Sequence, residues 1–410
     1  MYNTFFYIII AFFIAEFIVD CIIDYLNVKN IKLTLPDELK GIYDEKKYAE
    51  QQAYFKANKR VSNIKSFSSF FIVLVMLLTG VFGLLDEWLR TFIENPYWLM
   101  LTYFGILFIA NEILSLPFDV YSTFVIEEKF GFNKTTHKTF VSDLIKGWLI
   151  SALIGGGLLS LLLYIYNLIP QYFWILALAV VAVFSIFFMM FYSNIIVPLF
   201  NKQTPLEEGE LRDKIEQFAQ KAGFKLNNIY VIDGSKRSTK ANAYFTGLGA
   251  KKRIVLYDTL INDLTAEEIV AVLAHEVGHY KHKHTLYSLI FSLIVSAFEF
   301  YILSLFLGNE QLACALGGST ASFHLSLIGF ALIFSPISMI LSILTNIFSR
   351  HNVYQADAFA AGFGLAEPLK EGLKKLHVKS LSNLLPHKAY VFVHYSHPTL
   401  LQRIKALDNN

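Results

Sequence analysis

The sequence predicts a mainly α-helical protein that crosses a membrane several times and carries a smaller α+β segment on one side. Of its 410 residues, 55% are hydrophobic and only 17% are charged, whereas a soluble globular protein has about 25% charged residues. The apolar residues gather in stretches of about the 20 residues that an α-helix needs to cross a bilayer. Seven such stretches occur, at 4–23, 67–85, 98–118, 148–169, 173–196, 285–307 and 324–348.

The distribution of Lys and Arg predicts how these spans are oriented. Segments 26–66, 118–147, 201–284 and 349–410 contain nine, four, thirteen and eight of the 35 basic residues, and Arg90 is the remaining one. If seven spans alternate, all four segments fall on one side. The positive-inside rule makes that side the cytoplasm and places the N-terminus outside. The first stretch is expected to be a retained span, because it lacks the leading positive charge and the small-residue cleavage site of a signal peptide.

Acidic and thiol side chains lie in or near the spans and indicate their surroundings. Glu16, Asp20 and Glu112 indicate a polar interior, since an ionisable group in a bilayer needs a partner or water. For Asp20, a position at the headgroups is an equal alternative. Cys21 and Cys314 lie in or beside apolar stretches, so we expect small buried hydrophobes rather than a disulfide or a metal site. The net charge of +2 gives no indication of a nucleic-acid partner.

The spans divide the chain into four segments. Residues 1–200 hold the first five spans, and 201–284 form the largest water-facing segment. Residues 285–348 hold the last two spans, and 349–410 form the C-terminal segment. Because the spans alternate, the two water-facing segments lie on the same, cytoplasmic side.

A histidine motif in the first water-facing segment predicts a metal site. His275 and His279 are four residues apart, so on an α-helix both imidazoles lie on one face and can bind a single cation. Glu276 can reach a water on that cation, as in the H-E-x-x-H arrangement of zinc-dependent hydrolysis. The alternative is a helix with two solvated histidines. Thr265 followed by Glu268 forms a capping box, which favours a helix that begins just before the motif.

The same segment contains β-strand patterns. Residues 208–222 predict an amphipathic helix, and 228–233 and 253–257 predict strands. The aromatic stretch 242–247 is also β-prone. It is either a free edge strand, which can pair with an extended peptide beside the metal, or an ordinary inner strand.

Two more histidines follow the motif. His282 and His284 lead directly into the sixth apolar stretch. The metal is therefore expected at, or just inside, the cytoplasmic membrane surface. We expect both side chains to be solvated at this interface rather than to bind the metal.

Ordered blocks at 124–136, 196–202, 238–247 and 396–404, together with the histidine helix, resemble the type I CAAX prenyl endopeptidases. These are integral-membrane zinc metalloproteases, and the resemblance covers nearly the whole chain. It implies seven spans around an internal chamber and a zincin-like α+β unit completed by the C-terminal segment. It also implies one zinc ion per chain and a peptide or lipidated-peptide substrate in contact with membrane lipid. The oligomeric state stays open, and a monomer is consistent with the resemblance.

One position departs from this family. Members carry a glutamate zinc ligand in the pattern Ser-Arg-x-x-Glu-Tyr-Gln-Ala-Asp-x-Phe-Ala, and residues 349–360 match it except that Val353 stands at the glutamate position. Valine has no lone pair to give, and catalytic zinc normally takes three protein ligands. His351 lies on the opposite helix face. Asp357 lies one turn, about 5.4 Å, further along, and the resemblance gives it a supporting catalytic role. We therefore expect impaired zinc binding.

The resemblance implies further site residues. His397 resembles the residue that polarises the substrate carbonyl, and Arg403 resembles a substrate contact. For this pair the alternative is an ordinary capped helix. Asn242 resembles a residue of the substrate-binding edge strand.

These observations predict a membrane zinc endopeptidase that cleaves prenylated CAAX-type or other membrane-associated peptides, impaired by Val353, with Glu276 as general base. An inactive scaffold that binds peptides or lipopeptides is the main alternative. A transporter is a weaker one, because no internal repeat is present. The Lys/Asn/Ile/Phe-rich composition indicates a bacterial homologue in the inner membrane, whereas a eukaryotic source would place the chain in the endoplasmic reticulum. In both cases the active site faces the cytoplasm.

Overall fold

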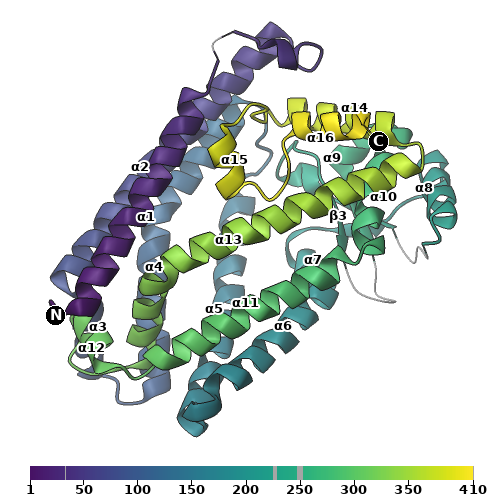
Figure 1. The fold of residues 1–410 in the computed structure, drawn as a ribbon. Helices are drawn as coiled ribbons and strands as arrows, with labels where there is room; N and C mark the ends of the chain where they lie inside the picture. Colours follow the sequence, from purple (N-terminus) through teal and green to yellow (C-terminus); the bar gives the residue numbers. More distant parts are fainter. Residues whose placement is uncertain (33, 225–228, 247–252, 410) are drawn as a thin grey trace.

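Seven long apolar helices dominate the structure, a computed structural model that describes residues 1–410 apart from residues 33, 225–228, 247–252 and 410 (Figure 1). Each is long and apolar enough to cross a membrane, so the expectation of seven spans is confirmed. The helices are α1 (Thr4–Lys29), α2 (Glu45–Thr79), α4 (Pro96–Tyr121) continued by the π-helical η2 (Ser122–Glu127), α5 (His137–Leu168), α6 (Phe173–Ile195) continued by α7 (Val197–Phe200), α11 (His284–Phe306) and α13 (Phe323–Gly362).

The second span ends earlier than the sequence predicts. Apolar residues continue to 85, but α2 stops at Thr79 because Gly80 adopts a left-handed conformation with φ 70°. Glycine takes this conformation at little cost and commonly ends helices. A separate helix, α3 (Val81–Arg90), then packs against the chain that follows α12 (Glu310–Ala315).

The last long helix carries part of the site out of the membrane. α13 has 40 residues, which at 1.5 Å per residue is about 60 Å, roughly twice the thickness of a hydrocarbon core. Its apolar half therefore spans, and its C-terminal half reaches the water-facing unit, where it packs along α10 (Ala266–Lys281).

The water-facing unit contains a four-stranded sheet with the order β1-β2-β4-β3. β2 (Ile229–Ile232), β3 (Ala243–Thr246) and β4 (Arg253–Tyr257) confirm the three predicted strands, whose positions 228 and 247 lie outside the described residues. β1 (Gln203–Pro205) was not predicted. β3 pairs antiparallel with β4 and, among the described residues, with no other strand. The stretch 242–247 therefore contains an edge strand, which decides between the two sequence alternatives.

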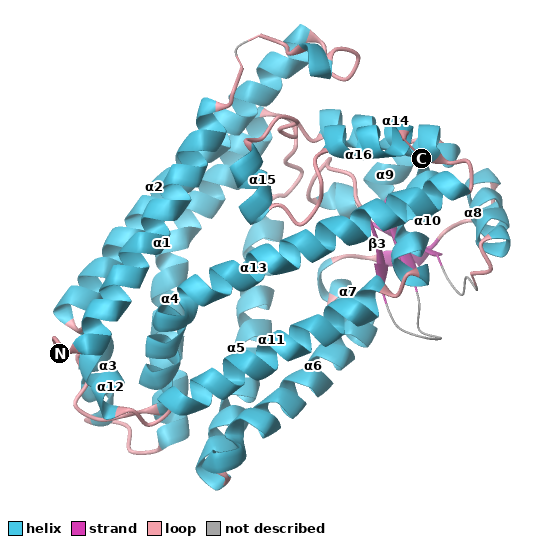
Figure 2. Ribbon diagram, viewed as in Figure 1, coloured by secondary structure: helices cyan, strands magenta, loops and turns pink. Residues whose placement is uncertain are grey.

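Helices cover this sheet and enclose α10 (Figure 2). The predicted amphipathic helix is present as α8 (Glu210–Lys221), with Ile215 and Phe218 buried. The apolar face of α10 is buried in the same core, including Ile269, Leu273 and Val277. The remaining helices of this unit are α9 (Asp258–Asp263), α14 (Ala366–Lys379), α15 (Lys388–His394) and α16 (Leu400–Asp408), with short turns η1 (Asp37–Leu39) and η4 (Gly234–Lys236); η3 (Pro170–Tyr172) joins α5 to α6.

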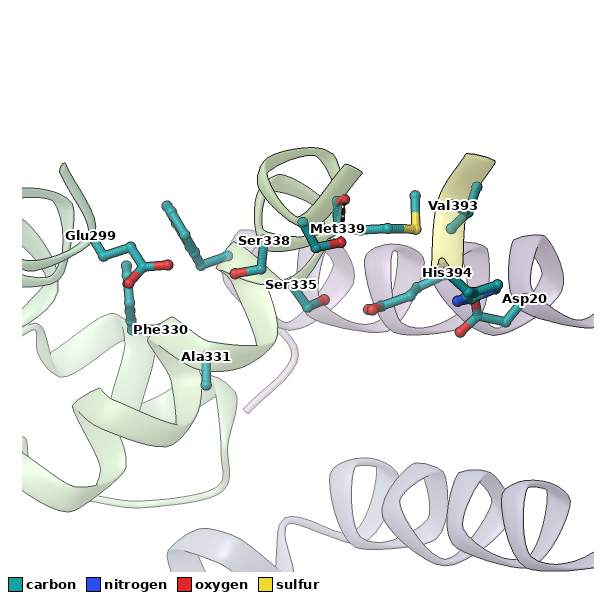
Figure 3. A pocket seen from close by; sticks show the side chains of 12 residues that line it. Asp20, Glu299, Phe330, Ala331, Ser335, Ser338, Met339, Val393 and His394 are labelled. Atoms are coloured by element: carbon teal, nitrogen blue, oxygen red, sulfur yellow. Dashed lines mark hydrogen bonds between the residues drawn. The ribbon is translucent and has the colours of Figure 1, made fainter. Parts of the chain in front are cut away.

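Acidic side chains line a cavity of about 570 Å³ between α1, α11, α13 and α15 (Figure 3). Asp20 lies beside His394, and Glu299 faces them across Ser335 and Ser338. Glu16 also lines this cavity, so both of these acids of α1 face the same cavity. Glu112 instead finds a partner on the neighbouring helix, where it accepts a hydrogen bond from Trp148 Nε1 at 2.8 Å.

Candidate functional site

Helix α10 brings the two motif histidines together. Its start is fixed by the predicted capping box, with both reciprocal hydrogen bonds between Thr265 and Glu268 present. The Nε2 atoms of His275 and His279 lie 3.2 Å apart. Two nitrogens bound tetrahedrally to one zinc at 2.0–2.1 Å would lie about 3.3 Å apart. The histidine pair therefore has the spacing that a single zinc ion requires.

A buried carboxylate holds His275 from behind. Asp357 Oδ1 lies 2.8 Å from His275 Nδ1, and Arg403 donates to both carboxylate oxygens, at 2.8 Å and 2.6 Å. When Nδ1 donates to the carboxylate, the Nε2 lone pair is left free to bind a metal. Asp357 is thus engaged away from the metal position. Arg403, a predicted substrate contact, is buried behind His275, and its substrate role stays a prediction.

A different pair of side chains holds His279. Its Nδ1 lies 3.0 Å from His284 Nδ1, and His284 Nε2 lies 2.8 Å from Gln355 Oε1. An amide oxygen only accepts, so His284 donates through Nε2 and its Nδ1 accepts. His279 then donates from Nδ1, and its Nε2 lone pair faces His275. Both motif histidines are therefore held in the metal-binding tautomer.

The burial of His284 corrects the sequence expectation. His284 is only 4% exposed, whereas a solvated interface residue was expected; His282 is exposed as expected. The cause is Lys283, whose left-handed backbone with φ 57° turns the chain between α10 and α11. The turn directs His284 back beneath His279. Without knowledge of this turn, the sequence does not predict that a histidine five residues after the motif contacts His279.

Burial changes the protonation of the site. Desolvation, followed by the neighbouring His275 and His284, lowers the pKa of His279 to about 3. His279 is therefore neutral at pH 7, as a metal ligand must be. Burial raises the pKa of Glu276, while His275 and Arg403 oppose the rise. Glu276 and His279 line a cavity of about 210 Å³ that also touches Ser349.

Val353 lies on the face of α13 that is turned toward His275 and His279. It is four residues after Ser349 and four before Asp357, so the three share one face of α13. Its side chain is only 1% exposed. Within the described part of the chain, no group of three or more His, Cys, Asp or Glu residues is placed to hold a metal ion. The residues present fit two zinc ligands but not the third.

The remaining predicted residues lie around the histidine pair. His397 is exposed, has its Nδ1 3.0 Å from Ser396 Oγ, and is near enough to contribute to the lowered pKa of His279. Asn242 is exposed just before β3, and its carbonyl accepts from the backbone of Tyr257 at 3.0 Å. β3 contacts α10, so the edge strand and the motif helix adjoin.

Seven membrane helices, an edge strand and two converging histidines beside a carboxylate define an integral-membrane protein of the metallopeptidase class. Comparisons with known proteins agree. The family model described as CAAX prenyl protease N-terminal, five membrane helices, matches residues 24–202, and Peptidase family M48 matches residues 205–410. The chain belongs to the CAAX prenyl protease family, within the M48 metallopeptidases.

Relatives match along nearly the full length. The chain is 36% identical to "CAAX prenyl protease 1 homolog" of Arabidopsis thaliana over 98% of this chain and 96% of the relative. It is 35% identical to "CAAX prenyl protease 1" of Saccharomyces cerevisiae over 98% and 94%. The crystal structure of S. mikatae Ste24p superposes with a TM-score of 0.93 at 35% identity and covers 100% of both chains.

Proposed function

We propose that this chain is a membrane zinc endopeptidase whose activity is impaired because Val353 occupies the position of the third zinc ligand. The 3.2 Å approach of the two Nε2 atoms beside Glu276 carries the proposal. His275 and His279 would hold the ion. When bound, zinc acts as a Lewis acid and makes a water acidic enough to ionise near neutral pH.

The chain's own residues supply the other functions. Glu276 takes the proton of the attacking water at its carboxylate, and its raised pKa suits a proton acceptor that works near neutrality. His397 donates a hydrogen bond to the substrate carbonyl oxygen as negative charge develops there. The free edge of β3 binds the peptide as an added strand, which holds the scissile bond near α10.

The substrate is a peptide or lipidated peptide that reaches the site from the membrane. Two relatives are named CAAX prenyl proteases, and the site joins directly onto the sixth and seventh spans. The basic segments support a site on the cytoplasmic side. The composition that indicates a bacterial source would make this the inner membrane, and a eukaryotic source would make it the endoplasmic reticulum.

A peptide-binding scaffold is the second candidate, and Val353 is the observation that favours it. Zinc per chain and cleavage of a farnesylated CAAX peptide should be measured in the parent, Val353→Glu and Val353→Gln. We expect glutamate to raise both zinc content and cleavage, and glutamine, of similar size but a poor zinc ligand, to raise neither. Glutamate that restores zinc without cleavage would favour the scaffold. Equal zinc and equal activity in all three forms would show that another residue fills the third position.

A further inference from the structure

A third cavity, of about 560 Å³, lies where the fifth span meets the sheet. The span ends at Phe200, and the cavity is lined by this end, by α5 and by residues of β1, β2 and β4. Helix α6, which α7 continues, contacts β3 near this junction. Within the described part of the chain, it shares no lining residue with the cavity beside Glu276 and His279.

Four basic side chains line this cavity. They are Lys146, Lys202, Lys236 and Arg253. None of them has an ion-pair partner among the described residues. Two are held in place: Lys146 Nζ donates to the carbonyl of Leu199 at 2.9 Å, and the Arg253 guanidinium stacks over the Tyr230 ring at 4.7 Å. Lys202 and Lys236 are exposed and free to close on a ligand.

Among the described residues, one carboxylate lines the cavity, and it does not neutralise these charges. Asp233 Oδ1 accepts from Asn201 Nδ2 at 3.0 Å and from the backbone N–H of Lys202 at 2.8 Å. It therefore fixes the end of the span to the strand rather than pairing with a lysine ammonium. The lining keeps an excess of positive charge at a membrane boundary. Basic pockets at the cytoplasmic ends of membrane helices recognise anionic headgroups.

We propose that this cavity binds a phosphate-bearing anion, supplied either by an anionic lipid headgroup or by free phosphate. Lys202 and Lys236 contact the phosphate from the exposed side, and Arg253 from the sheet. The bound anion contacts α5, the end of the fifth span and the sheet. It therefore stabilises the packing of the water-facing unit against the membrane helices. The proposal does not depend on peptidase activity.

The test measures ligand binding by the full chain in neutral detergent. Dioctanoylphosphatidylglycerol is titrated by native mass spectrometry and melting temperature, with dioctanoylphosphatidylcholine as the zwitterionic control. Lys202→Gln with Lys236→Gln removes two exposed charges. Lys388→Gln with Lys405→Gln removes two exposed charges outside the cavity. We expect affinity for the anionic lipid to fall about tenfold or more in the first double variant and to stay within about twofold in the second.

Further measurements identify the source of the phosphate and show whether the variants fold. Inorganic phosphate that binds as tightly as the lipid, with the same dependence on Lys202 and Lys236, would make free phosphate the ligand. Arg253→Lys keeps the charge but loses the stacking of the guanidinium on Tyr230, so it should weaken binding less than the double variant Lys202→Gln with Lys236→Gln does. Absence of binding in the parent, or equal loss in both double variants, would overturn the proposal. Neither lysine side chain makes a hydrogen bond within the described residues, so the melting temperature without ligand should not change.

Discussion

At the scale of residues, the free Nε2 lone pair of each motif histidine depends on the hydrogen bond that its Nδ1 makes. His275 uses Asp357, a charged partner that Arg403 holds from two sides. His279 uses His284 and the neutral amide of Gln355. The hydrogen bonds from His279 through His284 to Gln355 fix the tautomer of His279 only while residue 355 accepts a hydrogen bond.

Gln355 therefore offers a test of this tautomer relay. In a Val353→Glu background, Gln355→Leu removes the acceptor, frees His284 to change tautomer, and should lower zinc affinity by about 10- to 100-fold. Gln355→Glu keeps an acceptor and should preserve the affinity. Competition with a zinc chelator gives the affinities. A similar loss in both variants would contradict the relay, because the acceptor would then not matter.

At the scale of elements, the site depends on how closely α10 and α13 approach. A Cβ atom added at Gly278 would lie 3.0 Å from the Cα of Ala356 and 3.1 Å from its carbonyl oxygen. Backbone atoms cannot move aside as a flexible side chain can. The glycine of the motif thus allows the contact that brings Asp357 to His275 and places Val353 at the site.

Gly278→Ala is expected to push these helices apart. Overpacking typically costs about 1–3 kcal/mol, which exceeds the gain of up to about 1 kcal/mol from helix propensity. We expect a lower melting temperature and, with Val353→Glu present, lower zinc occupancy. Gly147→Ala in α5 is the matched control, since nothing lies within 4 Å of its added Cβ. It should be neutral or stabilising, and the same loss at both positions would refute the close-contact explanation.

At the scale of the molecule, the water-facing unit and the short connections α3 and α12 lie at opposite ends of the long helices (Figure 1). The end formed by α3 and α12 has its own buried cluster. Asp86 Oδ1 lies 2.6 Å from His324 Nε2, and Arg90 Nε donates to the other oxygen at 2.8 Å. This cluster ties α3 to the start of α13 and closes that end of the helices.

The charge distribution predicts that this closed end faces away from the cytoplasm. Cysteines placed at the exposed Glu94 and Glu310, after removal of Cys21 and Cys314, should react with an impermeant thiol reagent added outside intact cells. A cysteine at the exposed Lys46 serves as control and should react only after permeabilisation. Labelling of Lys46→Cys in intact cells, with protection of the other two, would reverse the orientation.

Local sequence patterns predicted helices and strands well where a single hydrophobic pattern or capping motif dominates. The seven apolar stretches, the capping box of α10 and the three strands at 228–233, 242–247 and 253–257 are all present. These features depend on neighbouring residues alone. The predictions were wrong where a single backbone conformation intervened, at Gly80, which ends α2, and at Lys283, which buries His284.

The sequence by itself therefore determined the membrane class, the seven apolar spans, three of the strands and the two histidines of one helix face, because these follow from the spacing of residues along the chain. It also showed that Val353 lacks a lone pair. Only the tertiary structure decided that β3 is an edge strand, that Asp357 and Arg403 stand behind His275, and that His284 and Gln355 stand behind His279. These contacts join residues far apart in the chain, and the close packing of α10 against α13, which no local period encodes, brings them together.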